Sequence, residues 1–175
     1  MSIRNPAFAL LVVIAAATCA LHAAPAEKDN VSKIDLWTLL DALPSRMPLD
    51  AQQVQAAFGV ALGHVSANEY VDFFEGGPAH LADAVDIEKL DLRMHKHQPH
   101  RLLALSLAGR CIERSVVLSR YDGLQISDHP RSTFPDQQTY WSTRQPWGKL
   151  SFGFAQGKPD CLRTVVLDTW PPASE

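Results

Sequence analysis

The sequence lacks the short patterns that mark the commonest enzyme chemistries. It has no G-x-S-x-G elbow, no S-x-x-K in a suitable setting, no H-E-x-x-H and no glycine-rich loop of the kind that cradles phosphates. Residues 76–78 (Gly-Gly-Pro) are expected to form a turn. No pattern for holding a cofactor is present either. We therefore expect a protein that is not an enzyme and that carries no cofactor.

An excess of charge of one sign is also missing. The chain has 16 Lys and Arg against 19 Asp and Glu, which gives a formal net charge of −3 and no basic footprint for nucleic acid. A hydrophobic content of 46% with 20% charged residues excludes a disordered chain. The length of 175 residues fits one domain, or two small halves that share a core.

The first 26 residues have the pattern of a signal peptide. Arg4 supplies a positively charged start, and residues 7–17 form an apolar run of eleven residues. A helix needs about 20 apolar residues to cross a bilayer, so this run is too short, and no longer one follows. We expect export to the periplasm or secretion, with no transmembrane span.

Two kinds of processing are compatible with this leader. Cleavage after Ala23 or Ala26 would release a soluble protein. The alternative is lipidation at Cys19, although residues 16–18 (Ala-Ala-Thr) make a poor lipoprotein signal. The sequence favours the soluble form.

The two remaining cysteines are expected to pair. Cys111 and Cys161 are an even pair in an oxidising compartment, and no C-x-x-C redox motif is present. The alternative is two buried thiols. We predict a structural disulfide bond.

Two segments of the chain resemble each other. Residues 89–107 superpose on residues 149–167 without gaps, and each copy alternates apolar and polar residues before and after a turn that contains a proline. This alternation predicts two β-hairpins with one buried face each. The identical positions are Lys89/Lys149, Leu90/Leu150, Pro99/Pro159, Leu102/Leu162 and Leu107/Leu167.

The correspondence continues upstream of the hairpins. Residues 54–59 match residues 117–122 as short amphipathic helices that end near glycine. Each helix is followed by an aromatic strand, at residues 70–74 and 139–142. Chance alignment of two amphipathic hairpins is the alternative, but the shared order of helix, strand and hairpin favours a duplication.

The predicted fold class is α+β: short N-terminal helices with an antiparallel sheet, built from a duplicated α-β-β-β unit. Asp50 and Gln53 are expected to cap the first repeat's helix, and an extra helix is expected over residues 32–43. The expected organisation is a signal peptide at 1–26, an N-terminal helix and linker at 27–48, a first repeat at 49–108 and a second at 109–175.

This order of elements resembles the architecture of the β-lactamase inhibitor protein. The single unit is similar to the small lipoprotein of the outer-membrane assembly machine, and several periplasmic immunity proteins share the outline. The resemblance covers roughly residues 49–169 and is one of pattern. It implies a protein that binds another protein across its sheet.

Three histidines near the first hairpin turn are the only metal-ligand cluster. His95, His97 and His100 lie within six residues of one another, a spacing open to Zn²⁺ or Cu²⁺. An exposed turn offers little support for the orientation of ligands, so a solvated turn is the favoured interpretation and no metal is expected.

The aromatic residues of the second repeat are the best candidates for partner binding. Trp and Tyr are the usual anchors of protein interfaces. By alternation, either Tyr140 or Trp141 should face the core, and the turn at Trp147 favours exposure. Residues 124–138 form a long proline-containing loop, and such loops are often functional. The predicted partner-binding residues are Trp147, Trp141, Tyr140, Phe134, Asp72 and Glu75.

The sequence therefore predicts an exported inhibitor or immunity protein that covers the active site of a toxin or hydrolase. The alternatives are an envelope-assembly lipoprotein anchored through Cys19 and a histidine-rich periplasmic metal-binding protein.

Overall fold

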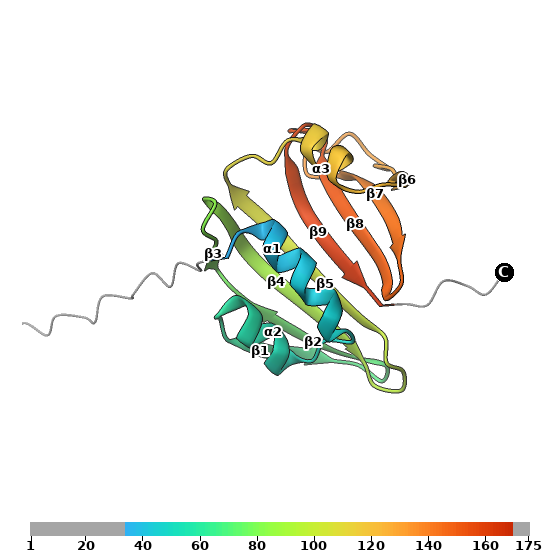
Figure 1. The fold of residues 1–175 in the computed structure, drawn as a ribbon. Helices are drawn as coiled ribbons and strands as arrows, with labels where there is room; N and C mark the ends of the chain where they lie inside the picture. Colours follow the sequence, from blue (N-terminus) through green and yellow to red (C-terminus); the bar gives the residue numbers. More distant parts are fainter. Residues whose placement is uncertain (1–33, 170–175) are drawn as a thin grey trace, which may run out of the picture.

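A computed structural model describes residues 34–169 as an α+β fold dominated by one antiparallel sheet (Figure 1). The predicted signal peptide and Cys19 lie outside the described residues. Within residues 34–169, no helix is long and apolar enough to span a membrane. The helical segments are α1 (Leu36–Ala42), the 3₁₀ turn η1 (Leu43–Arg46), α2 (Ala51–Phe58) and α3 (Arg114–Arg120).

The sheet has nine strands, and all of its strand pairs are antiparallel. Its order is β1-β2-β4-β5-β9-β8-β7-β6, with the short β3 paired to β4. Strands β5 and β9 therefore lie at the centre, and β1 and β6 form the edges. The strands are β1 (Leu62–Ala67), β2 (Val71–Gly76), β3 (Ala79–His80), β4 (Val85–His95), β5 (Arg101–Gly109), β6 (Gln125–Asp128), β7 (Gln138–Gln145), β8 (Gly148–Ala155) and β9 (Leu162–Asp168).

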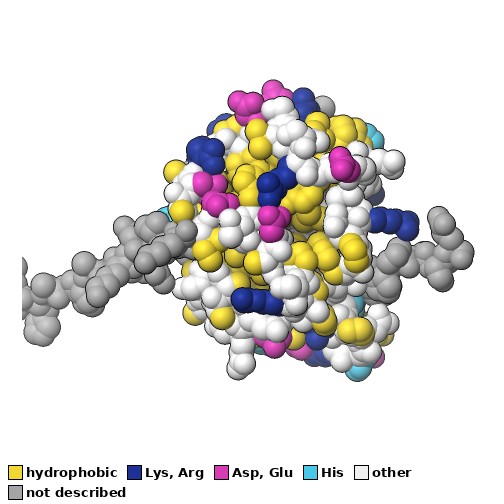
Figure 2. Space-filling view, in the orientation of Figure 1, with side chains coloured by type: hydrophobic (Ala, Val, Ile, Leu, Met, Phe, Trp, Pro, Cys, Tyr) yellow, Lys and Arg dark blue, Asp and Glu magenta, His cyan; other side chains and the backbone are white. Residues whose placement is uncertain are grey.

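All three α-helices lie on the same face of this sheet (Figure 1). Their buried side chains, such as Leu40, Val54 and Val117, join one core with Leu105 of β5 and Phe152 of β8. Alternation along β4 and β5 places every second side chain in this core, apart from a bulge in β4, as the sequence pattern predicts. Figure 2 shows the helix-bearing side, where hydrophobic atoms reach the surface between scattered charged groups.

Local sequence signals explain where the second helix begins and ends. Asp50 accepts a hydrogen bond from the Gln53 backbone N–H at 2.8 Å, and the Gln53 side chain accepts one from the Asp50 N–H at 2.9 Å. Gly59 closes α2 with φ of 68°, a left-handed conformation that glycine adopts without strain. The predicted capping box is confirmed.

Three strands were not predicted from the sequence: β1, the two-residue β3 and β6. In each half a strand lies between the helix and the aromatic strand: β1 in the first half and β6 in the second. The prediction that residues 124–138 form one loop is therefore wrong at residues 125–128, which pair with β7. Both edge strands are short and mostly exposed, and a β-bulge interrupts the pairing of each. Neither therefore has the regular alternation of apolar and polar residues that predicts a strand.

The predicted hairpins are β4–β5 and β8–β9, but their hydrogen-bond registers differ by two residues. Leu90 lies opposite Leu105 in the first hairpin, whereas Phe152 lies opposite Val165 in the second. Leu150 instead faces Leu167. The gapless superposition of the sequences therefore does not follow the ladders, although a shift of two keeps each side chain on the same face.

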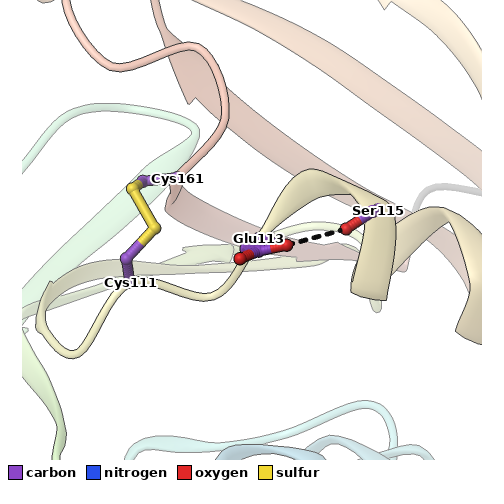
Figure 3. The surroundings of a disulfide bond; sticks show 4 residues. All are labelled: Cys111, Glu113, Ser115 and Cys161. Carbon is purple, nitrogen blue, oxygen red and sulfur yellow. Dashed lines mark hydrogen bonds between the residues drawn. A yellow bond between two sulfur atoms is a disulfide. The ribbon is translucent and has the colours of Figure 1, made fainter.

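The predicted disulfide bond between Cys111 and Cys161 is present, with an S–S distance of 2.01 Å (Figure 3). It joins the segment before α3 to the residue before β9. Glu113 forms an isolated β-bridge with Cys161 and accepts a hydrogen bond from the Ser115 hydroxyl at 3.1 Å. The disulfide bond therefore fixes the start of α3 against the central strand β9.

Candidate functional site

The face of the sheet opposite the helices is the candidate site, and we call it the uncovered face. No helix among residues 34–169 lies on it. Strand alternation and the ladder registers assign to it Phe73, Glu75, Lys89, Asp91, Arg93, Leu102, Ala104, Ser106, Tyr140, Ser142, Arg144, Lys149, Ser151, Gly153, Thr164, Val166 and Asp168.

Small side chains form the centre of the uncovered face. Ala104, Val166, Ser151 and Ser142 lie side by side across four strands. Ser142 and Ser151 are buried although no described helix covers them. Taller neighbouring side chains therefore cover these two serines, while Ala104 and Val166 are half-buried, and we call the region of these four small side chains the sunken centre.

A row of hydroxyl groups crosses the second half of this face. The Ser142 hydroxyl donates to Ser151 Oγ at 2.7 Å, and Ser127 Oγ lies 2.6 Å from Ser142 Oγ. The row joins β6, β7 and β8. The side-chain partners in this row are other serine hydroxyls and not a histidine or carboxylate base, so the row itself activates no nucleophile.

Tyr140 is the aromatic anchor of the uncovered face. Its ring lies against Gly153, where an added Cβ would come within 2.8 Å of Tyr140 Cε1. Burial raises the pKa of Tyr140, and the nearby Thr164 side chain of β9 opposes that shift. The ring therefore lies across three strands and is held before any partner arrives.

Ion pairs surround the sunken centre on its first-half side. Lys89 Nζ lies 2.6 Å from Glu75 Oε1, and the Arg93 guanidinium contacts Asp91 at 2.9 Å. Arg93 also lies over the Phe73 ring, at 5.9 Å from its centroid. Exposed pairs of this kind contribute little to stability, so their charges are available to a charged partner.

The structure distributes the predicted partner-binding residues over two faces. Tyr140 and Glu75 lie on the uncovered face, while Trp141 and Asp72 take the alternate positions, toward the helix side. Asp72 Oδ1 lies 3.3 Å from His64 Nε2 and 3.4 Å from Lys96 Nζ. The six residues therefore do not form one continuous surface.

Trp147 and Phe134 differ in exposure from each other. Trp147 is half-buried and packs against the core, so the prediction that its turn exposes it is wrong. Phe134 is 70% exposed. Its loop is held to the end of β8, where the Gly157 N–H donates to the Pro135 carbonyl at 2.9 Å and the Gln156 side chain donates to the Ser132 carbonyl at 2.6 Å. A held loop that displays Phe134 is compatible with partner binding.

The three histidines do not form a shared metal site. The His95 and His100 rings stack at 4.3 Å with a 34° tilt, and His100 Nε2 lies 2.8 Å from Asp168 Oδ1. Stacked rings direct their nitrogens sideways rather than toward one point, and His97 is exposed. No metal-competent group of three ligands occurs among the described residues. His100 has a side chain only 13% exposed, so the prediction of a solvated turn is wrong for this residue.

A cavity of about 550 Å³ lies beside the disulfide bond. Its two arginines already have partners, since Arg110 contacts Asp83 at 2.9 Å and Arg163 contacts Glu88 at 2.7 Å. Lys158 and the carboxylates Glu88 and Asp136 also line the cavity, so its charge is mixed, and we treat it as a weaker candidate than the uncovered face.

Sequence reasoning missed the serine row and the Tyr140–Gly153 contact. Alternation identifies small residues on β7 and β8, but only the strand register places Ser142 beside Ser151 and Tyr140 beside Gly153.

No protein-family model, curated protein or solved structure matches this chain.

Proposed function

We propose that this chain is an exported protein that binds another protein across the uncovered face and blocks that partner's active site. The specific form that we propose is an immunity protein or enzyme inhibitor. The observation that carries the proposal is that one whole face of a nine-stranded sheet has no helix on it among the described residues, while the opposite face buries the core.

The arrangement of the strands supports a duplicated origin for this face. The order β1-β2-β4-β5 in the first half is followed by β9-β8-β7-β6 in the second, so each half has its last strand at the centre. Helix α2 precedes β1 as α3 precedes β6. This order is compatible with the resemblance to the β-lactamase inhibitor protein and the periplasmic immunity proteins.

The surface chemistry supports binding rather than catalysis. The sunken centre gives a protruding segment of a partner room to approach, and Tyr140 provides a rigid aromatic contact whose ordering is already complete. Exposed ion pairs such as Lys89–Glu75 lie beside the sunken centre, and their charges can select between partner proteins. Inhibition then needs no covalent step, because occupation of the partner's cleft excludes its substrate.

A capture experiment with matched variants tests the proposal. The mature chain, residues 27–175, is immobilised and exposed to the periplasmic and secreted fractions of the host, and bound proteins are identified by mass spectrometry. Ala104→Arg places a large cation in the sunken centre, whereas Gln52→Arg adds the same charge at an exposed position of α2.

We expect the wild type and Gln52→Arg to capture the same toxin or hydrolase in equal amounts with the chain, and Ala104→Arg to lose it. Equal capture by all three proteins would exclude the uncovered face as the interface. Recovery of envelope-assembly components instead of an enzyme would contradict the inhibitor proposal.

A further inference from the structure

A second pocket, of about 360 Å³, lies at the ends of β7 and β8 beside the start of α3. It belongs to the helix side of the sheet and is separate from the uncovered face. We propose that it is a binding site for an apolar group that carries a carboxylate. Its lining residues are Arg114, Ile126, His129, Thr139, Trp141, Phe154, Gln156 and Pro159.

The apolar part of the pocket is built on three neighbouring strands. Ile126 of β6 lies opposite Trp141 of β7, and Thr139 of β7 lies opposite Phe154 of β8. Phe154 is 2% exposed and Trp141 packs against the core, so the base of the pocket is fixed by the fold. Ile126 is 42% exposed, and a ligand that covers it gains apolar burial.

The charged part of the pocket is cationic. Arg114 and His129 are its ionisable lining residues, and the lining contains no carboxylate. Arg114 contacts Asp160 at 2.9 Å, with side-chain exposures of 41% and 76%. Such a surface pair is weak, and the guanidinium has five N–H donors, so it can bind a second carboxylate in a bidentate way.

The combination of the two parts defines the ligand. A purely apolar molecule would leave the Arg114 guanidinium unused, and a small inorganic anion would leave Trp141 and Ile126 uncovered. An aromatic or aliphatic carboxylate uses both. This chemistry has two sources: a free small organic acid, or the C-terminal residue of a polypeptide with an apolar side chain.

Nuclear magnetic resonance of the mature chain tests this site directly. The indole N–H of Trp141 is assigned by its loss in Trp141→Phe. The probes are 3-phenylpropionate and its neutral amide, and the peptide Gly-Gly-Ser-Phe with a free or an amidated C-terminus. We expect saturable shifts of the Trp141 signal with the acids, and about tenfold weaker binding of the amides, because one charge-assisted contact is lost.

Saturation by the peptide acid alone would assign the site to chain ends, and saturation by both acids to the shared chemistry. Arg114→Gln should remove the preference for acid over amide, while Arg131→Gln, which removes an exposed cation outside the pocket, should keep it. The comparison of acid and amide binding to the wild-type chain tests the proposal without any substituted protein.

The proposal is overturned if no probe shifts the Trp141 signal at about 10 mM, a limit far above useful affinity, or if acids and amides bind equally. It is also overturned if Arg114→Gln, with the rest of its spectrum unchanged, keeps the full preference. None of these results depends on the uncovered face.

Discussion

Removal of the Cys111–Cys161 disulfide should lower the free energy of unfolding without changing the fold. The two cysteines are 50 residues apart, and closing a loop of that length removes unfolded-state entropy worth about 4 kcal/mol. Neighbouring backbone bonds remain in the variant: the Leu162 N–H donates to Ile112 at 2.9 Å, and the Arg114 N–H donates to Asp160 at 2.9 Å. The native contacts of α3 with β9 should therefore survive.

The perturbation is the double substitution Cys111→Ser and Cys161→Ser, compared with the oxidised wild type by urea unfolding followed by circular dichroism. We expect a loss of about 2–4 kcal/mol and a larger dependence on urea, because the unfolded chain is less compact without the bond. An unchanged unfolding free energy, or a lost β-sheet spectrum in the absence of urea, would refute the reasoning.

Two further substitutions test the uncovered face and the histidine pair. Gly153→Ala places a Cβ 2.2 Å from Gln138 Oε1 and 2.8 Å from Tyr140 Cε1, so both side chains must move. We expect the free energy of unfolding in urea to fall by about 1–3 kcal/mol. In an alkaline absorbance titration, the raised pKa of Tyr140 should also fall. No change in either quantity would contradict the packing of Tyr140 against Gly153. Burial, His100 and Arg101 lower the pKa of His95, so the folded state binds fewer protons there than the unfolded state, and stability should fall as the pH drops below about 6.5. His95→Gln should reduce this loss of stability at low pH, whereas His97→Gln, at an exposed position, should leave it unchanged. Equal dependence of stability on pH in the two variants would show that the stacked His95–His100 pair does not cause the loss.

Periodicity and cap chemistry account for the parts of the fold that were predicted correctly. The alternation of Leu90 and Leu92 marks a strand with one buried face, and Asp50 with Gln53 marks a helix start. The cysteine pairing was predicted from the number of cysteines and the expected oxidising compartment. Each of these signals is local, or needs no knowledge of which strands are neighbours.

The remaining features depend on contacts between distant strands. Edge strands β1 and β6 have one pairing partner and little burial, so their sequences carry no clear period. Trp147 lies in a turn, but its large ring finds room against the core, where burial of apolar surface outweighs the exposure that a turn favours. The interaction of His100 with Asp168 joins residues 68 positions apart, which spacing cannot predict.

The same limit applies to the candidate site. Tyr140 was identified as an aromatic candidate, but its place on the uncovered face follows from its register opposite Gly153. Phe134 remains a prediction as a partner contact, and its exposure keeps it a reasonable one. Trp141 lies on the other side of the sheet, where it belongs to the second pocket.

Inhibition of the captured enzyme is the most direct test of the account. The enzyme recovered by the wild-type chain is assayed at a fixed concentration while wild type, Ala104→Arg or Gln52→Arg is added. The account predicts that activity falls to zero near one equivalent of wild type or Gln52→Arg and persists with Ala104→Arg. An enzyme that binds the chain but keeps full activity, or that is inhibited equally by Ala104→Arg, would contradict it.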